Sequence, residues 1–474
     1  MLPFAVQDAT KTLRLTSRPR ASIITARIPV SPLLTSRLIA DRNNSNITSK
    51  RWSHTAKWRP VQVLDEYGPP ALRLWVVKEA RPISLRQLMV FGRSLTEARL
   101  ISSANYVRTE LPTRIAHRIR DMQRLPYVVV TNPHISDVYE LYYTAFDTFR
   151  RIREVKTLED NEHLCKEISK MLRAHLTVIP KLAMGILECS GLMPAAELDH
   201  FMNTILRSRI SRRVIAEQHL ALTETFNSHW FSPGAKLSES EFIGEVFIKC
   251  IAKDVIEHCA KAVQDLARSA NGPDTKIPEI RINGHMESSF PYILSHLEYI
   301  IGELLRNSVQ AVIEKHQKSK DPSSNPPPIE VTLCEAPQHV IIRISDQGGG
   351  IPRDILPYLW SFGKGPLKNQ RLENLGQVPL MAATLQELKV NDSKLTGLQS
   401  QRSGHDSSLS SLATRPPNLR LGMGLPLSRV YAEYWAGSLE LHSLEGYGVD
   451  AFLQISKLGN KNEQLATRAA MDAV

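Results

Sequence analysis

The sequence predicts a protein of two unlike halves, an N-terminal helical bundle followed by an α/β sandwich. From about residue 84 to 230, apolar residues recur at the three- and four-residue steps of amphipathic helices. After about residue 234, short β-branched runs alternate with helical segments, which is the pattern of a layered α/β domain. The length of 474 residues fits two or three domains better than one core.

The helical half is clearest between residues 160 and 189. Its apolar residues fall on one helix face, at Leu164, Ile168, Met171, Leu172, Ile179, Leu182 and Ile186. Pro180 lies inside this stretch and is expected to kink the helix. Similar periodicity predicts helices over 111–124, 134–154 and 194–226. Short connections between long amphipathic helices favour a bundle.

The second half is expected to begin with a helix over 240–268. The strands that follow are expected at 280–285, 329–335, 339–345, 438–443 and 449–455. Two more helices are expected at 295–318 and 424–435. Residues 366–418, rich in Ser, Leu, Gln, Asn and Gly, interrupt this alternation. Their composition and length favour a long mobile loop, either a lid or a disordered insert.

Residues 1–52 differ in composition from the rest of the chain. They hold nine basic and two acidic residues, which is +7 of the formal net charge of +11, and they are rich in Ser and Thr. This composition is typical of a mitochondrial transit peptide, with processing expected near Arg51–Ser53; a disordered basic tail is the alternative. Because the remaining residues are nearly neutral, the charge does not point to a nucleic-acid partner.

The residues also argue against a membrane span and a zinc site. No stretch reaches the roughly 18 apolar residues that cross a bilayer, so we expect no transmembrane helix. The five cysteines are Cys165, Cys189, Cys250, Cys259 and Cys334. They form no C-x-x-C pair and have no histidine cluster beside them, so we expect reduced thiols.

The first chemical signal is the pair Glu303 and Asn307 in a helical stretch. Positions i and i+4 share one helix face. A carboxylate can accept the proton of an attacking hydroxyl, and an amide oxygen is a hard ligand suited to magnesium. Alone, the pair is more often two polar residues on a solvated helix face.

The second signal is the turn Asp346-Gln-Gly348-Gly-Gly350, which follows a strongly β-forming run. A carboxylate at a strand end can bind the exocyclic amine of adenine. The glycines let the backbone approach a flat base and adopt special φ and ψ angles. A tight turn after a strand is an equally good interpretation of this motif alone.

The third signal is Gly422-Met-Gly424-Leu425-Pro at the start of an apolar helix. Glycines before a helix N-terminus expose backbone N–H groups and the positive end of the helix dipole, which suit phosphates. The motif is not a dinucleotide fingerprint, because the third glycine and a preceding parallel strand are missing. It is not a Walker motif either, because no G-K-[ST] follows.

Together, in this order, the three signals resemble the Bergerat (GHKL) ATP-binding fold of gyrases, heat-shock chaperones, histidine kinases and mitochondrial protein kinases. Longer strings narrow the resemblance to the mitochondrial 2-oxoacid dehydrogenase kinases, which act on branched-chain or pyruvate complexes. These strings are LMVFGR at 88–93, LPTRIAHRI at 111–119, RINGH at 281–285 and YAEY at 431–434. The resemblance covers about residues 80–365 and 419–457.

The resemblance implies a protein serine kinase of the mitochondrial matrix that works as a homodimer. Such an enzyme transfers the ATP γ-phosphate to the decarboxylase subunit of a 2-oxoacid dehydrogenase complex and inactivates it. It docks on the lipoyl domains of the acyltransferase core. The implied domains are a transit peptide (1–52), a helical bundle (53–233), an ATP-binding kinase domain (234–457) containing the lid 366–418, and a flexible tail (458–474).

By position, the resemblance assigns a role to each motif residue. Glu303 would be the general base and Asn307 the magnesium ligand. Asp346 would hold adenine, with Gly348 and Gly350 at its pocket. The phosphate region would be lined by Gly422, Gly424 and Leu425. Relatives also bind potassium near the nucleotide, but its ligands cannot be placed in this sequence.

Three departures from the family pattern stand out. Pyruvate dehydrogenase kinases carry a His one turn before the base, where this chain has Tyr299, as the branched-chain kinase does. The final glycine box usually reads G-x-G-T and here ends in Val449, which removes a hydroxyl near the adenine. The region from Ser361 to Arg420 is long and unusual, so contacts of the lid to ATP cannot be transferred.

Some basic residues allow more than one interpretation. His175 precedes a proline at the spacing of a phosphorylated histidine, but Leu176 replaces the usual acidic neighbour, so we favour an ordinary helix histidine. The run at Arg207, Arg209, Arg212 and Arg213 fits a solvated helix face as well as a contact with a partner or the other domain. A second run, at Arg114, Arg118, Arg120 and Arg124, is expected to be a charged helix face.

Two other functions stay open beside the kinase. One is an ATP-driven conformational machine of the gyrase or chaperone class, which would hydrolyse ATP without a phosphoprotein product. The other is a non-catalytic scaffold on the dehydrogenase core, suggested by Val449 and the lid. Tyr299 and the string matches favour a branched-chain complex over a pyruvate complex. The preference is slight, because substrate choice depends on docking surfaces that no motif marks.

Overall fold

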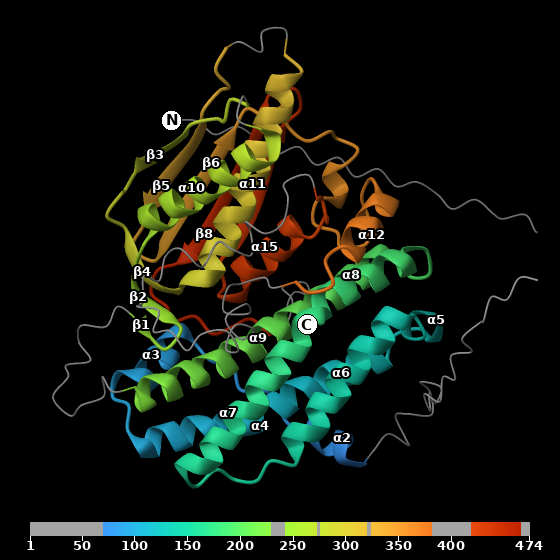
Figure 1. Ribbon diagram of the computed structural model, residues 1–474, viewed down its shortest axis with the longest axis vertical. Coiled ribbons are helices and arrows are strands. Elements are labelled where there is room, and N and C mark those ends of the chain that lie inside the picture. The colour runs from blue at the N-terminus through green and yellow to red at the C-terminus, as the bar shows by residue number, and fades with distance from the viewer. Residues whose placement is uncertain (1–69, 229–241, 273–274, 320–323, 382–418, 466–474) are drawn as a thin grey trace, which may run out of the picture. The chain divides into compact units, whose positions relative to one another are not determined.

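The computed structural model describes residues 70–228, 242–272, 275–319, 324–381 and 419–465. The expected transit peptide and the lid residues 382–418 lie outside this range. Among the described residues, no helix has the length and apolar content needed to cross a membrane. Both predicted halves are present, a helical bundle followed by a sheet covered by helices (Figure 1).

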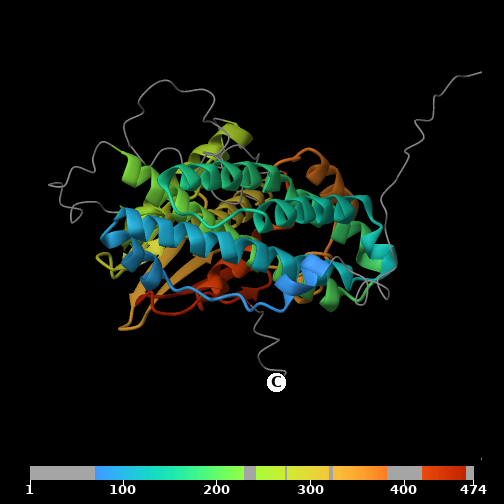
Figure 2. The ribbon, with the colours of Figure 1, turned by 90° about the horizontal axis from the view of Figure 1, so that it is seen from below.

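The bundle is built on two long helices, α4 (Glu97–Gln123) and α9 (Ala195–Asn227). They pack against each other, and α6 (Pro133–Arg150) and α7 (Leu158–Ala174) pack on α4 (Figure 2). The predicted helices are therefore confirmed, although α4 begins earlier than the pattern at 111–124 indicated. Shorter helices complete this half: α2 (Pro70–Val76), α3 (Leu85–Arg93), α5 (Tyr127–Val130) and α8 (Val178–Glu188).

The break predicted in the stretch 160–189 is present, but it lies before the proline. Helix α7 ends at Ala174, a 3-10 turn follows at His175–Thr177, and α8 begins at Val178. Pro180 therefore occupies the first turn of α8, where its missing N–H has no intrahelical partner to lose.

The second half is a five-stranded sheet in the order β3-β5-β6-β8-β7. Only β3 and β5 run parallel, and the other neighbours are antiparallel. The strands are β3 (Ile280–Gly284), β5 (Ile329–Glu335), β6 (His339–Asp346), β7 (Ser438–Leu444) and β8 (Gly448–Ser456). Helices α10 (Ala252–Asn271), α11 (Leu294–Gln317) and α15 (Gly424–Tyr434) cover one face (Figure 1).

The helix predicted over 240–268 is wrong in its first part. Residues 242–251 form β1 (Phe242–Ile243) and β2 (Val246–Ile251), and the helix begins at Ala252. Strand β2 pairs with β1 on one side and with β4 (Ser289–Ile293) on the other, in a separate three-stranded sheet. None of these three strands was predicted. The run Val-Phe-Ile-Lys-Cys-Ile is β-branched and aromatic, so its local preference was for a strand.

The lid region is also not wholly irregular. Helix α12 (Lys368–Gly376) lies within the predicted loop and packs on α8 of the bundle. Arg371, Asn374 and Leu375 are its buried residues. The prediction of a structureless loop is therefore wrong for 368–376.

The first basic run is buried, and the second is buried at Arg114 alone. Arg207, Arg209, Arg212 and Arg213 are each at most 6 % exposed, so the solvated-face interpretation is wrong. Arg207 forms an ion pair with Glu433 of α15, which is a contact with the other half of the chain. In the other run Arg114 is only 2 % exposed, so it does not belong to a charged surface face.

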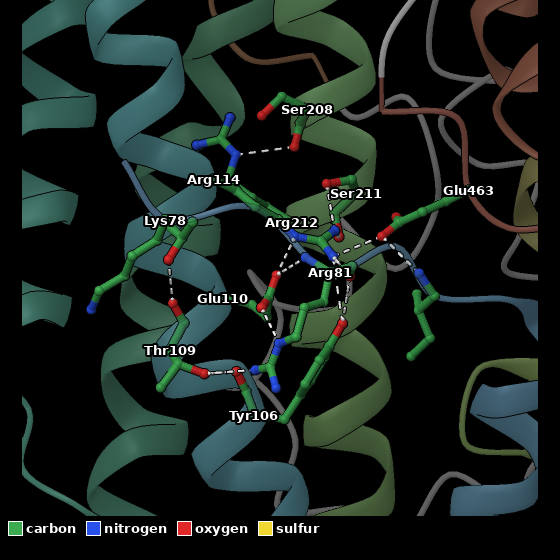
Figure 3. Close-up of polar contacts among 12 residues, drawn as sticks. Lys78, Arg81, Tyr106, Thr109, Glu110, Arg114, Ser208, Ser211, Arg212 and Glu463 are labelled. Atoms are coloured by element: carbon green, nitrogen blue, oxygen red, sulfur yellow. Dashed lines mark hydrogen bonds and ion pairs between the residues drawn. The ribbon is translucent and has the colours of Figure 1, made fainter. Parts of the chain in front are cut away.

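Arg114 anchors the C-terminal segment on the bundle (Figure 3). Its Nη2 lies 2.7 Å from a carboxylate oxygen of Glu463, and Ser211 Oγ accepts a second hydrogen bond at 2.7 Å. Glu463 also accepts a hydrogen bond from Tyr434 of α15. Residues 459–465, expected to be part of a flexible tail, are therefore attached to both halves of the chain.

Candidate active site

Helix α11 supplies the centre of the site. Its buried side packs against α10, α15 and β6. Glu303 on this side is 3 % exposed, whereas Asn307, one turn later, is exposed. The two residues thus lie where the buried side of α11 meets its exposed side. The Glu303 carboxylate is in the protein interior, and the Asn307 amide is at the surface.

Glu303 lies directly against the start of α15. A Cβ placed on Gly424 would come within 2.3 Å of Glu303 Oε2, closer than real Cβ contacts. Glycine at this position therefore lets the carboxylate approach the helix N-terminus. The predicted general base and the predicted phosphate motif, far apart in sequence, meet here.

Asp346 ends β6 and is 5 % exposed. Its Oδ2 accepts a hydrogen bond from Ser308 Oγ at 2.9 Å, and its Oδ1 accepts one from Gly348 N at 2.8 Å. Burial raises the pKa of this carboxyl, while the hydrogen bonds from Gly348 and Ser308 act in the opposite direction. Ser308 follows Asn307 on α11, so the first two sequence motifs meet through this contact.

The turn after Asp346 needs glycine for two separate reasons. Gly350 has φ +74°, and a Cβ there would lie 2.3 Å from the carbonyl oxygen of Leu444. A Cβ on Gly348 would lie 2.5 Å from Ala311 Cβ of α11. The turn is therefore held tightly between helix α11 and the β7–β8 hairpin.

Lys315 fixes the same turn from α11. Its Nζ donates to the carbonyl oxygens of Gln347, Gly446 and Tyr447 at 3.0–3.2 Å. Gly446 N also donates to Gly349 O at 2.7 Å. The final glycine box therefore supports the Asp346 turn through its backbone.

Two of the departures from the family pattern lie within the site, namely Val449 on β8 and Tyr299 on α11. Val449 pairs with Asp346 across β6 and β8, and a backbone hydrogen bond from Val449 opposes the rise in the pKa of Asp346 that burial causes. Val449 thus supports the carboxylate without a side-chain hydroxyl. Tyr299 is 4 % exposed, and its ring lies 5.2 Å from that of Tyr431 on α15.

The glycine motif before α15 has the backbone shape that the sequence predicted. Gly422 has φ +69°, a region that favours glycine, and Gly424 is the first residue of the eleven-residue helix α15. Leu425 in the first turn is half-buried. The arrangement directs backbone N–H groups of a helix N-terminus toward the region beside Glu303.

His175 does not look like a phosphate-accepting residue. It is 5 % exposed, and its ring lies 5.3 Å from that of Tyr142. Burial lowers its pKa well below the ordinary value, and the charge of Arg212 adds to this effect. The burial supports the ordinary structural histidine that we favoured.

Sequence reasoning missed three residues that shape the site, namely Ser308, Lys315 and Arg371. Ser308 follows Asn307 directly, and a hydroxyl next to the first motif was a usable signal. Arg371 of α12 donates to the carbonyl of Gly422 in the phosphate turn at 3.3 Å. Like Lys315, it binds backbone carbonyls, and no sequence pattern marks such contacts.

The site combines the Glu303 carboxylate, which lies beside the N-terminus of α15, with the buried Asp346 at a strand end. Two glycine turns of the same α/β domain complete it. This arrangement defines an ATP-binding domain of the gyrase, chaperone and histidine-kinase class. Comparison with family models agrees, because residues 293–457 match the histidine kinase-, DNA gyrase B- and HSP90-like ATPase family. Residues 82–247 match the mitochondrial branched-chain alpha-ketoacid dehydrogenase kinase family.

Relatives of known name span most of the chain. Pyruvate dehydrogenase (acetyl-transferring) kinase 2 of Saccharomyces cerevisiae is 34 % identical over 82 % of this chain and 84 % of its own length. The mitochondrial pyruvate dehydrogenase (acetyl-transferring) kinase of Arabidopsis thaliana is 30 % identical over 82 % of this chain and 94 % of its own length. Pyruvate dehydrogenase (acetyl-transferring) kinase isozyme 4 from Homo sapiens is 26 % identical over 80 % of this chain and 82 % of its own length.

The chain therefore belongs to the family of mitochondrial pyruvate and branched-chain 2-oxoacid dehydrogenase kinases. It is an ATP-binding protein kinase with a mitochondrial location.

Proposed function

We propose that this kinase transfers the γ-phosphate of ATP to a serine of the decarboxylase subunit of the mitochondrial pyruvate dehydrogenase complex and thereby inactivates it. The relatives described above are named pyruvate dehydrogenase kinases, which favours that complex. The preference of the sequence for a branched-chain complex remains the competing possibility, because Tyr299 matches that relative. The proposal includes a matrix location, docking on lipoyl domains of the acyltransferase core, and a homodimer.

The observation that carries the proposal is the contact between Glu303 and the N-terminus of α15. A phosphate bound at the Gly422–Gly424 turn would lie beside a buried carboxylate. Glu303 would take the proton of the substrate serine as its oxygen attacks the γ-phosphorus, and ADP would leave. Such a transfer needs mainly positioning and charge stabilisation from the protein.

The nucleotide fits the remaining groups. Asp346 keeps a carboxylate at the strand end, held by Ser308 and Gly348, and can accept a hydrogen bond from the exocyclic amine of adenine. The missing Cβ atoms of Gly348 and Gly350 leave the turn flat against its neighbours. Leu425 would line the phosphate region from the first turn of α15.

Magnesium and potassium need separate consideration. The exposed amide of Asn307, one turn from Glu303, fits a magnesium ion that is shared with the ATP phosphates. Magnesium would neutralise charge on those phosphates. Potassium does not fit the backbone carbonyls beside the phosphate turn, because the Arg371 side chain already binds them.

The proposal is tested by labelled γ-phosphate transfer from ATP to purified pyruvate and branched-chain dehydrogenase complexes in parallel. Label on a serine of the pyruvate decarboxylase subunit, with loss of complex activity, is the expected result. Label on the branched-chain subunit alone would contradict the substrate assignment. ATP binding without label on either complex would favour the scaffold, and release of free phosphate would favour the ATPase.

A further inference from the structure

A buried guanidinium lies beside the phosphate turn, where no sequence motif predicted a charge. Arg371 of α12 is 6 % exposed. A buried arginine usually pairs with a carboxylate, because the cost of removing its charge from water is high. In the described part of the chain, the four hydrogen bonds of Arg371 go instead to backbone carbonyl oxygens.

The four carbonyls come from two loops that flank the lid. On the side before α12, Arg371 donates to Phe362 O at 2.9 Å and Lys364 O at 3.2 Å. On the side after the lid, it donates to Leu421 O at 3.2 Å and Gly422 O at 3.3 Å. One guanidinium therefore ties both ends of the lid region to the glycine turn that opens α15.

The turn is built around this side chain. A Cβ on Gly422 would lie 2.3 Å from Arg371 Nε and 2.5 Å from its Cζ. Glycine is thus required at 422 both for φ +69° and because the guanidinium fills the space of a side chain. Asn374, one turn later on α12, also donates to the carbonyl of Arg420 at 2.9 Å.

A negative charge from the bundle faces the same loop. Asp199 on α9 accepts hydrogen bonds from Phe362 N at 2.8 Å and Gly363 N at 3.4 Å. The Phe362 residue therefore donates to Asp199 and accepts from Arg371. Burial lowers the pKa of Arg371, and the charge of Asp199 acts against this effect. The peptide group between Phe362 and Gly363 is therefore polarised by Asp199 on its N–H side and by Arg371 on its carbonyl side.

Several backbone carbonyls that surround one cationic group form the type of site that holds a dehydrated monovalent cation such as potassium. Here the four carbonyls surround the guanidinium and bind its three nitrogens. We propose that Arg371 replaces such an ion with a charge built into the chain. Its guanidinium orders the phosphate turn, so nucleotide binding by this kinase is independent of potassium. This inference rests on the proposed ATP site at Gly422–Gly424. It departs from the potassium site that the family resemblance implied.

Arginine suits this role better than a bound ion in one respect. Its planar fork has five N–H donors in fixed directions, so it can hold four carbonyls in one geometry. An ion would have to be recruited each time the turn formed. The side chain is attached to α12, which packs on the bundle helix α8, so the order of the turn is coupled to the bundle.

The test is ATP binding by the full chain, measured by calorimetry at constant magnesium and ionic strength. Potassium chloride is compared with tetramethylammonium chloride, whose cation is too large for a carbonyl ring. The wild-type affinity is expected to change less than about twofold between the salts, which is under roughly 0.5 kcal/mol. An affinity that falls severalfold without potassium would overturn the inference.

Variants separate the cation role from a merely structural one. Arg371→Ala should lose about tenfold in affinity and regain part of it with millimolar guanidinium or with potassium, but not with tetramethylammonium. Arg371→Lys keeps a charge without the fork and should bind ATP between the two. Arg281→Ala, an exposed arginine on β3 that is paired with Glu279, is the matched control and should match wild type in both salts.

The remaining outcomes are equally informative. If Arg371→Ala binds ATP like wild type in both salts, the guanidinium does not order the turn and the inference is wrong. If Arg371→Ala does not fold, the salt comparison on the wild-type chain still decides. If the wild-type chain binds no nucleotide in either salt, the proposed ATP site itself fails, and this inference fails with it.

Discussion

Arg114 of the bundle and Glu463 near the C-terminus form a buried ion pair with a distance of 2.7 Å, and both side chains are at most 2 % exposed. Glu463 also accepts hydrogen bonds from Tyr434 of α15 and from the backbone N–H of Ile83. One carboxylate therefore joins the bundle, the N-terminal residues before α3 and the ATP-binding half; Figure 3 shows its contact with Arg114.

Removing this carboxylate should destabilise the chain strongly. Glu463→Ala leaves Arg114 buried with Glu110 as its remaining acidic partner, so we expect a loss of roughly 3 kcal/mol in the free energy of unfolding. Urea unfolding at pH 7 measures it. Glu279→Ala breaks the exposed pair with Arg281 and should cost less than about 1 kcal/mol. Equal costs for the two variants would show that the Glu463 contact contributes no more than a surface pair.

Glu303→Gln should abolish phosphotransfer and leave ATP binding nearly intact. The amide has the size of the carboxylate but cannot accept the serine proton, while the nucleotide contacts lie on other residues. Single-turnover transfer and ATP calorimetry measure the two effects separately. Transfer at the wild-type rate would remove Glu303 from the role of base.

Gly424→Ala tests the same contact from the other side. The added Cβ would lie 2.3 Å from Glu303 Oε2, so the carboxylate or the start of α15 must move. We expect the transfer rate to fall by more than about tenfold, which corresponds to ~1.4 kcal/mol in the barrier. Gly376→Ala at the end of α12 meets no atom within 4 Å and serves as the control. An unchanged rate in Gly424→Ala would mean that the contact has no catalytic importance.

The sequence predicted the order of the halves, most of the helices and five of the strands, because periodicity and β-branched runs are local properties. It also identified Glu303, Asp346 and the glycine turns as candidates, because their spacing is short. It could not predict that α11 brings Ser308 to Asp346, since that contact depends on how a helix packs on a sheet.

The errors have a common physical cause. Arg114 was interpreted from charge alone, yet it is buried against Glu463, which is distant in sequence. For Arg207, charge left a solvated face and a contact with the other domain equally open, and only the ion pair with Glu433 decides for the contact. Arg371 lies in a region whose composition predicted a loop, and its partners are backbone carbonyls, which every residue carries. Long-range neutralisation of charge leaves no local pattern.

His219 predicts a pH dependence of stability. Its ring nitrogens lie 3.1 Å from Ser103 Oγ and 2.9 Å from Asn161 Oδ1, and burial lowers its pKa from 6.5 to about 4. Because the folded pKa is lower than the unfolded one, the unfolded chain binds the proton first. The contribution of neutral His219 to the free energy of unfolding is therefore fully present above pH 6.5. It falls by on the order of 3 kcal/mol as the pH decreases toward 4.

Urea unfolding between pH 7 and pH 4.5 measures this effect. His219→Gln should be less stable at pH 7 but should lose less stability on acidification than the wild type. His442→Gln removes an exposed histidine of β7 and should keep the wild-type pH dependence. A pH dependence of His219→Gln that equals that of the wild type would show that other groups cause it.

Asp346 predicts a pH dependence of nucleotide binding. Burial raises the pKa of its carboxyl, so protonation begins at a higher pH than for an ordinary aspartate. The ionised carboxylate is the stronger acceptor for the adenine amine, and protonation replaces one acceptor oxygen by an O–H donor. ATP affinity should therefore weaken as the pH falls toward the raised pKa, and Asp346→Asn should bind weakly at every pH with a flatter profile. ADP calorimetry from pH 7.5 to 5 measures both chains, and the difference between their profiles removes the titration of the terminal phosphate, which both chains share. Asp346→Ala should weaken binding still further, because Ser308 and Gly348 lose their acceptor, and unchanged affinity in that variant would place adenine elsewhere.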